Sequence, residues 1–363
     1  MQDNALQFFR AAIETPSPSG YEERIQALVR QYIQPHADQV RIDIHGNLIA
    51  ELGPSQIDSK TTPRLMYAGH CDQIGMLVSH IDDNGYVYAQ TIGGWDPQQL
   101  IGQAMSIWTD SGEVPAVISR KPIHLLTAQE RKQVVSLDEM WLDVGASSRE
   151  QAADRIRIGD AITLRLGLRE MLNSIVTGPG MDNRTGMWTV IDSLRRAKEK
   201  AGDALRCHLH SVSTVQEEIG LRGAKTAAGG INPDVAIAVD VTHASDCPTI
   251  DKNKQGDIRV GGGPVIYRGP NINPGVASRL IELAEAAKIP YQLAAIGRAT
   301  PNDANALQLN GSGVATGLIA IPNRYMHSAV EAISLEDIDH VAELLSEFAT
   351  HLTSKDDFTP RVL

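Results

Sequence analysis

The feature that most limits what this chain can fold into is an unbroken run of five apolar residues at 235–239. Similar runs occur at 65–68 and 317–321. A strand without polar alternation is typical of a sheet that is covered on both faces. Helical periodicity separates these runs, for example after residues 182–184 and at 280–287. The pattern therefore predicts an α/β domain with helices on both sides of its sheet.

Residue types that bind metals follow several of these strands. His70 comes after the run at 65–68, Asp240 ends the run at 235–239, and Glu217-Glu218 follow a strand predicted around 205–209. Taken singly, each has an ordinary explanation, because adjacent carboxylates are mostly solvated and a lone histidine is usually structural. In open α/β sheets, however, sites form beyond the carboxyl ends of the strands. We therefore expect these side chains to converge.

The hydrophobic pattern changes between residues 73 and 168, where short segments of alternating apolar and polar residues are separated by turn signals. This stretch contains three of the four tryptophans, Trp95, Trp108 and Trp141. The pattern predicts a small β-barrel or sandwich inserted into a larger domain. We expect residues 1–72 and 169–363 to form the catalytic domain, and the insert at 73–168 to contact another subunit or shape the substrate entrance.

Three further predictions concern the ends of helices and the C-terminal tail. Asp182 and Asn183 fit the N-cap of a helix, which is the ordinary role for Asp182 outside a site. Ser334 and Asp337 resemble a capping box at the start of the last helix. The polar tail from Thr353 onward is expected to fray.

Charge and composition exclude several classes of function. The 363 residues are 42% hydrophobic and 21% charged, which is ordinary for a globular protein. A net charge of −11 argues against nucleic acid or an anionic membrane as main partner. The sequence shows no signal peptide or apolar span, and the widely spaced Cys71, Cys207 and Cys247 form no disulfide framework, so we expect a cytoplasmic protein.

Six motifs resemble, in the same order, those of the tetrahedral co-catalytic metallo-aminopeptidases, which include glutamyl aminopeptidases and proteins labelled endoglucanase M. The motifs are Gly-His-Cys-Asp-Gln-Ile-Gly at 69–75, Gly-Gly-Trp-Asp at 93–96, Asp-Asn-Arg-Thr-Gly at 182–186, Val-Gln-Glu-Glu-Ile-Gly at 215–220 with Arg-Gly-Ala at 222–224, Asp-Val-Thr at 240–242 and Arg-Tyr-Met-His-Ser at 324–328. The resemblance covers nearly the whole chain.

This resemblance implies a zinc-aminopeptidase-like three-layer sandwich with a mixed central sheet and an inserted small β-barrel for dimerisation. It implies peptide substrates, two divalent metal ions per subunit (zinc first, cobalt or manganese as alternatives), and a homo-oligomer whose dimers can assemble into a tetrahedral dodecamer. The implied metal ligands are His70, Asp182, Glu218, Asp240 and His327.

In the implied arrangement Asp182 bridges the two metals, Glu217 is the general base, and Asp72 orients His70. His70 and Asp240 complete one metal site, and Glu218 and His327 complete the other. The chemistry of the residues agrees, because imidazole and carboxylate ligands without thiolate suit zinc, cobalt or manganese. Two such metals can activate a shared water whose proton Glu217 takes, so that N-terminal residues are hydrolysed from peptides.

Some positions depart from the family pattern, and other functions stay open. Gln73 and Asn183 stand where the family often has acidic residues, and the loop 300–304 replaces a run of small residues, so side-chain preference can differ. Cys71 is interpreted as a small buried residue. His208, His210 and His243 are interpreted as structural, and His243 is the one among them expected to contact the metal ligands from outside. The alternatives are another hydrolase, such as a glycosidase or deacylase, or a non-catalytic scaffold. A glycosidase needs two free carboxylates, and here only Glu217 is spare.

Overall fold

A mixed sheet of eight strands forms the centre of the computed structural model, which describes residues 1–54 and 61–360. Its central strands β12, β3, β13 and β16 run parallel. Strands β1 and β2 are antiparallel to their neighbours, and β14 is antiparallel to β16 but parallel to β15. In spatial order the strands are β1 (Gln39–Ile42), β2 (Leu48–Leu52), β12 (His208–Thr214), β3 (Arg64–His70), β13 (Val235–His243), β16 (Ala315–Asn323), β14 (Val265–Arg268) and β15 (Gln292–Ala295).

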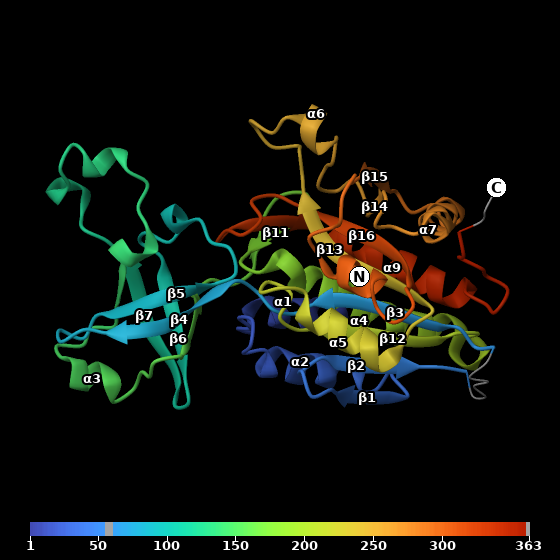
Figure 1. Ribbon diagram of the computed structural model, residues 1–363, viewed down its shortest axis with the longest axis horizontal. Coiled ribbons are helices and arrows are strands. Elements are labelled where there is room, and N and C mark those ends of the chain that lie inside the picture. Colours follow the sequence, from blue (N-terminus) through green and yellow to red (C-terminus); the bar gives the residue numbers. More distant parts are fainter. Residues whose placement is uncertain (55–60, 361–363) are drawn as a thin grey trace.

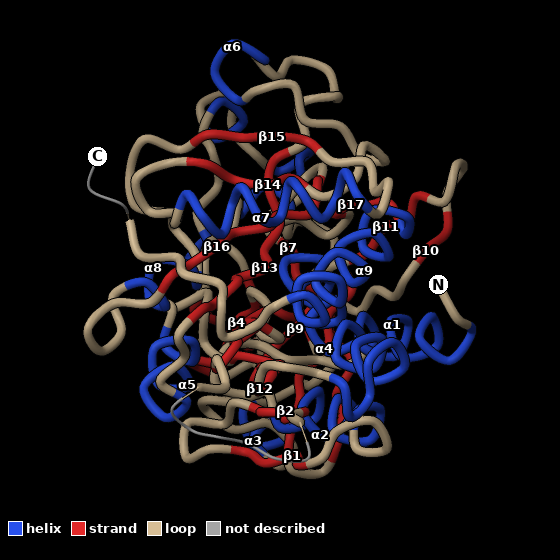
Figure 2. Tube along the Cα trace, turned by 90° about the vertical axis from the view of Figure 1, so that its right-hand side faces the viewer, coloured by secondary structure: helices blue, strands red, loops and turns tan. Residues whose placement is uncertain are grey.

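Helices cover both faces of this sheet and complete three layers. Helices α5 and α8 lie on one side of the strands, and α1, α4 and α9 lie on the other (Figure 2). The helices are α1 (Asp3–Glu14), α2 (Glu23–Ile33), α3 (Arg149–Ala153), α4 (Met181–Ala201), α5 (Arg222–Ile231), α6 (Lys252–Gln255), α7 (Pro274–Ala286), α8 (Asp303–Gln308) and α9 (Leu335–His351). The described residues contain no helix long and apolar enough to cross a membrane.

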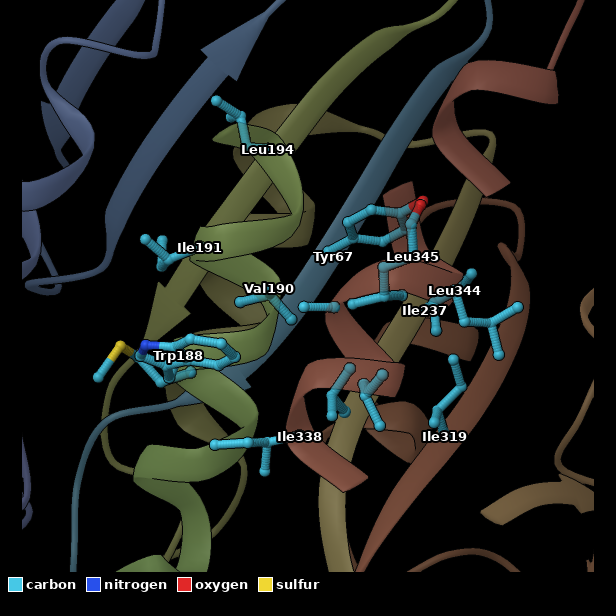
Figure 3. Close-up of a cluster of buried hydrophobic side chains, with 14 of the residues drawn as sticks. Tyr67, Trp188, Val190, Ile191, Leu194, Ile237, Ile319, Ile338, Leu344 and Leu345 are labelled. Atoms are coloured by element: carbon cyan, nitrogen blue, oxygen red, sulfur yellow. The ribbon is translucent and has the colours of Figure 1, made fainter. Parts of the chain in front are cut away.

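The main core lies between the sheet and the layer that contains α4 and α9 (Figure 3). Trp188 on α4 is fully buried, and its indole N–H donates to the Ala5 carbonyl at 2.9 Å. The Tyr67 hydroxyl on β3 donates to the Leu345 carbonyl at 2.7 Å, so the polar groups of both of these buried aromatic side chains have a partner. At Gly69, a Cβ would meet the backbone of Gly186 at 2.5 Å, which shows how closely α4 approaches β3 beside His70.

A closed six-stranded barrel stands apart from the main body (Figure 1). Its strands lie between residues 75 and 164, inside the region where the sequence changes texture, and they enclose a separate apolar core. They are β4 (Gly75–Ile81), β5 (Val87–Ile92), β6 (Ala104–Thr109), β7 (Gly112–Ser119), β8 (Trp141–Asp143) and β9 (Ala161–Leu164). The predicted fold class, an α/β sandwich with a mixed sheet and an inserted β-barrel, is confirmed.

A small three-stranded sheet lies between the barrel and the helices. It consists of β10 (Arg169–Glu170), β11 (Ile175–Gly178) and β17 (Glu331–Ser334), with β11 in the middle. Strand β11 leads directly into α4, and β17 leads into α9. This sheet therefore brings Glu331, the first residue of β17, close to the start of α4.

The local expectations at helix ends are partly wrong. Asn183 acts as an N-cap, as predicted, because its Oδ1 accepts from the Gly186 amide at 2.9 Å where the regular part of α4 begins. Asp182 does not cap the helix, and its side chain points to the site. Ser334 does cap α9 by accepting from the Glu336 amide, but the Asp337 carboxylate accepts from the amides of Gly261 and Gly263, both at 2.7 Å. A tertiary contact has therefore replaced the predicted capping box.

The tail is also more ordered than predicted over its described part, which ends at residue 360. Phe358 stacks against Phe348 of α9, with ring centroids 6.3 Å apart. Its carbonyl accepts from the Asn273 side chain at 2.8 Å. An aromatic residue in an otherwise polar segment thus attaches the tail to the helical layer.

Candidate metal centre

The predicted site residues gather at the carboxyl ends of three neighbouring strands. His70 is the last residue of β3, and it is paired in register with Thr214, the last residue of β12. Glu217 and Glu218 follow three and four residues after β12. Asp240 lies on β13, the neighbour of β3 on its other side. Convergence at this edge therefore follows from the parallel order of β12, β3 and β13.

One cluster surrounds the Nε2 atom of His70. This nitrogen lies 3.3 Å from Asp182 Oδ1, 3.7 Å from Glu217 Oε2 and 3.8 Å from Asp240 Oδ1. All four side chains are nearly buried. The group can hold one metal ion, and Glu217 is placed closely enough to touch the same ion or its water.

A second cluster surrounds the Nε2 atom of His327, four residues after the end of β16. This nitrogen lies 3.3 Å from Asp182 Oδ2 and 3.4 Å from Glu218 Oε2. Asp182 therefore turns one oxygen to each histidine. That is the geometry a carboxylate needs in order to bridge two ions.

The donor set fits divalent metals on three grounds. Ligands about 2.0–2.2 Å from a tetrahedral zinc ion lie roughly 3.3–3.6 Å apart, and the contacts of Asp182 with both histidines and of Glu218 with His327 fall in this range. Glu218 Oε1 is buried and lacks a hydrogen-bond partner among the described residues. The donors are oxygens and imidazole nitrogens, which zinc, cobalt and manganese accept.

Unbalanced negative charge is the dominant electrostatic property of this region. Burial raises the pKa of Asp240 to about 8 despite the nearby His70. Burial also raises the pKa values of Glu217 and Glu218, and neighbouring carboxylates add to both shifts. The hydrogen bond to Asp182 raises the pKa of His327 to about 9. The raised carboxyl pKa values reflect crowded, buried negative charge, which a bound cation would stabilise.

Asp72 does more than the predicted orientation of His70. Its Oδ1 lies 3.3 Å from His70 Nδ1. The same carboxylate accepts from the backbone amides of Glu217 at 3.0 Å and Glu218 at 3.1 Å, and from the Ser19 hydroxyl at 2.7 Å. Asp72 therefore holds both the ring of His70 and the backbone of the glutamate pair, as outer carboxylates of metal sites do.

Sequence reasoning missed two groups that position the second cluster. Glu331 is buried and accepts from the backbone amides of His327 at 2.7 Å and Asp182 at 3.1 Å. The Gly94 carbonyl, in the loop that follows β5 of the barrel, accepts from His327 Nδ1 at 2.9 Å, which leaves Nε2 free to bind metal. Glu331 stands four residues after His327, but only the contact with Asp182 reveals its role.

Three further positions singled out in the sequence are Cys71, the 300–304 segment and His243. Cys71 is fully buried, in agreement with its interpretation as a small structural residue. The 300–304 segment contains Asp303, whose carboxylate accepts from the Thr214 hydroxyl at 2.7 Å. Burial raises the pKa of Asp303 to about 6. His243 is exposed at the end of β13.

A cavity of about 570 Å³ opens onto both clusters. Its polar wall contains Asp182, Glu217, Glu218, Asp240 and His327. Its other lining includes Tyr267, Ile296, Leu318, Met326, His243 and Arg298. The size suits a small ligand or one end of a peptide, and the wall beside the metal-binding groups combines apolar and polar side chains.

Comparison with known proteins identifies the family. The sequence profile described as M42 glutamyl aminopeptidase matches residues 46–344. The chain belongs to the M42 family of aminopeptidases. It is therefore a hydrolase of peptide bonds.

Individual relatives and solved structures are similar to this chain over nearly its full length. The lysyl aminopeptidase of Pyrococcus furiosus is 38% identical, covering 98% of this chain and 99% of its own. A TET aminopeptidase from a marine sediment thaumarchaeon has a TM-score of 0.90 at 32% identity, covering 97% of this chain and 98% of its own. The TET1 peptidase of Pyrococcus horikoshii, which can assemble into a tetrahedron or a large octahedral shell, has a TM-score of 0.83 at 29% identity, covering 96% and 100%.

Proposed function

We propose that this protein is a dinuclear metal-dependent aminopeptidase that removes N-terminal residues from peptides. The position of Asp182 carries the proposal, because its two oxygens lie 3.3 Å from Nε2 of His70 and Nε2 of His327 respectively. His70, Asp182 and Asp240 would hold one ion, and Asp182, Glu218 and His327 the other. Zinc suits this set of donors best, with cobalt or manganese as alternatives.

Two divalent ions, if held by these residues, would polarise the peptide carbonyl and lower the pKa of a bound water. The protein supplies the proton transfers. Glu217 lines the cavity, and its Oε2 lies 3.7 Å from His70 Nε2. Glu218 lies closer to its own histidine, with Oε2 3.4 Å from His327 Nε2, and is the better candidate for a ligand. Glu217 therefore accepts the proton of the attacking water and donates it to the leaving amine.

The acidic wall of the cavity also explains a preference for N-termini. A free α-amine is a cation at neutral pH and is stabilised beside a carboxylate, whereas a blocked amine is not. The apolar wall formed by Tyr267, Ile296, Leu318 and Met326 would receive the side chain of the first residue. Residues 1–72 and 169–363 then act as the catalytic domain, and 73–168 as a dimerisation domain.

Metal content and substrate choice together test the proposal. We expect at least two divalent ions per chain by elemental analysis, and hydrolysis of aminoacyl-p-nitroanilides but not of their N-acetylated forms. The acetylated substrates are the matched control, because they keep the scissile amide and lose only the amine. Hydrolysis of both forms at equal rates, or full activity at one or zero ions per chain, would contradict the proposal. A panel of first residues would then define the preference of the apolar wall.

We also propose that the barrel contributes a contact between copies of this chain in a homo-oligomer. Exposed apolar side chains lie between β7 and β8, namely Ile123, Leu125 and Val134. Such side chains are typical of an interface when they occur together. The tryptophans of the insert are only partly exposed, and Trp95 and Trp108 use their indole N–H groups within the barrel.

Replacing two of these side chains, as Leu125→Asp with Val134→Asp, should reduce the molar mass measured by light scattering, because a charge buried at an interface is strongly unfavourable. The matched control is Ile44→Asp, at an exposed apolar position in the turn between β1 and β2. An unchanged molar mass in the double variant would refute this contact.

A further inference from the structure

A second group of metal-binding side chains lies on the central sheet, away from the proposed catalytic centre. It consists of Glu51 on β2 and His208 and His210 on β12. Strands β2 and β12 are antiparallel neighbours, and His210 lies directly opposite Glu51 in their register. His208 precedes His210 by two residues, so the three side chains share one face of the sheet.

The three side chains are arranged closely enough to hold one ion. Glu51 Oε2 lies 3.4 Å from His208 Nε2 and 4.0 Å from His210 Nδ1. One ligand atom from each residue fits within 4.8 Å of the others. For comparison, the ligands of a tetrahedral zinc ion lie roughly 3.3–3.6 Å apart, so rotations of the two rings would complete the geometry.

His210 is the most buried side chain of the three. The residue is 5% exposed, and neither of its ring nitrogens has a hydrogen-bond partner among the described residues. A buried imidazole without any partner is unfavourable, and such groups call for an explanation.

We propose that Glu51, His208 and His210 form an additional zinc site, distinct from the catalytic centre. Two imidazoles and one carboxylate are a known ligand set for zinc, with water in the fourth position. The other Glu51 oxygen, Oε1, accepts from Arg41 Nε at 3.0 Å, which fixes the carboxylate with Oε2 facing the histidines. His208 is partly exposed, so an ion can enter from solvent.

This site would act on stability rather than on catalysis. His210 lies four residues before Thr214, the end of β12 at the catalytic centre, which is roughly 13 Å along a strand. An ion bound here would connect β12 to β2, the second strand from the sheet edge. Arg41 neutralises part of the Glu51 charge, so we expect this ion to leave before those of the catalytic centre during dialysis against a chelator.

The test counts zinc in the intact protein. Wild type, His208→Gln, Glu51→Gln and the control His124→Gln are loaded with Zn²⁺, freed of excess metal by gel filtration, and measured by elemental analysis. We expect one zinc fewer per chain in His208→Gln and Glu51→Gln than in wild type, and no change in His124→Gln, an exposed residue in the barrel insert. Hydrolysis of aminoacyl-p-nitroanilides should be unchanged in His208→Gln.

Thermal unfolding gives a second readout, in which the contribution of the catalytic ions is common to both proteins and cancels in the difference. Added Zn²⁺ should raise the Tm of metal-stripped wild type by more than that of His208→Gln, because a ligand of the folded state alone stabilises that state. Equal zinc counts in wild type and His208→Gln, with equal Tm shifts, would overturn the proposal. Because the comparison is a difference of one ion, it holds whatever number the catalytic centre binds.

Discussion

Glu217→Gln should lower kcat by about 10²–10⁴-fold while the protein keeps its full metal content, since this is the usual contribution of a positioned acid–base group. The amide has nearly the same shape as the carboxylate but cannot accept a proton. The Glu217 backbone amide still donates to Asp72 at 3.0 Å, so the loop keeps its position. The measurement is kcat together with metal content in the same preparation.

Glu218→Gln is the matched comparison, because the two glutamates are adjacent and share Asp72 as backbone partner. Glu218 Oε2 lies 3.4 Å from His327 Nε2, so its loss should lower metal affinity, and added metal should partly restore the rate. If both variants lose activity in the same metal-dependent way, Glu217 is a ligand and the base has been assigned wrongly. If neither changes, the reaction takes place elsewhere.

Asp182→Asn should remove both ions and with them the activity, so that the variant resembles the chelated wild type. Asparagine keeps one acceptor oxygen and replaces the other by an NH₂ donor, which turns hydrogens toward one of the two clusters. Even residues that only orient a ligand change metal affinity by about 10–100-fold, and a shared ligand should exceed that. Titration of the metal-stripped variant with Zn²⁺, followed by elemental analysis and activity, checks the result.

Glu331→Gln provides the graded control for Asp182→Asn. Glu331 binds no cluster directly but accepts from the backbone amides of both Asp182 and His327. Its amide variant should weaken metal affinity by about 10–100-fold, and excess metal should restore activity. An Asp182→Asn protein that retains two ions and wild-type kcat would show that the carboxylate bridges nothing.

Much of the architecture follows from local patterns. The apolar runs at 65–68, 235–239 and 317–321 correspond to the buried strands β3, β13 and β16, because a strand without polar alternation has to be covered on both faces. The change to short alternating segments after residue 73 corresponds to the barrel. The ends of these strands also identify candidates for the site, since residues that follow parallel strands reach the same edge of the sheet.

Only the tertiary structure determined which groups, distant in the sequence, form hydrogen bonds with the site and helix-end residues. Asp337 has the spacing of a capping box, yet its carboxylate binds the amides of Gly261 and Gly263. His327 is oriented by the Gly94 carbonyl of the barrel, and Glu331 joins the start of α4 to the His327 loop. A sequence pattern specifies how a segment folds and which side chains it presents. Which backbone amide or carbonyl meets each of those side chains depends on how the sheets and the barrel pack together, and that is set only when the whole chain has folded.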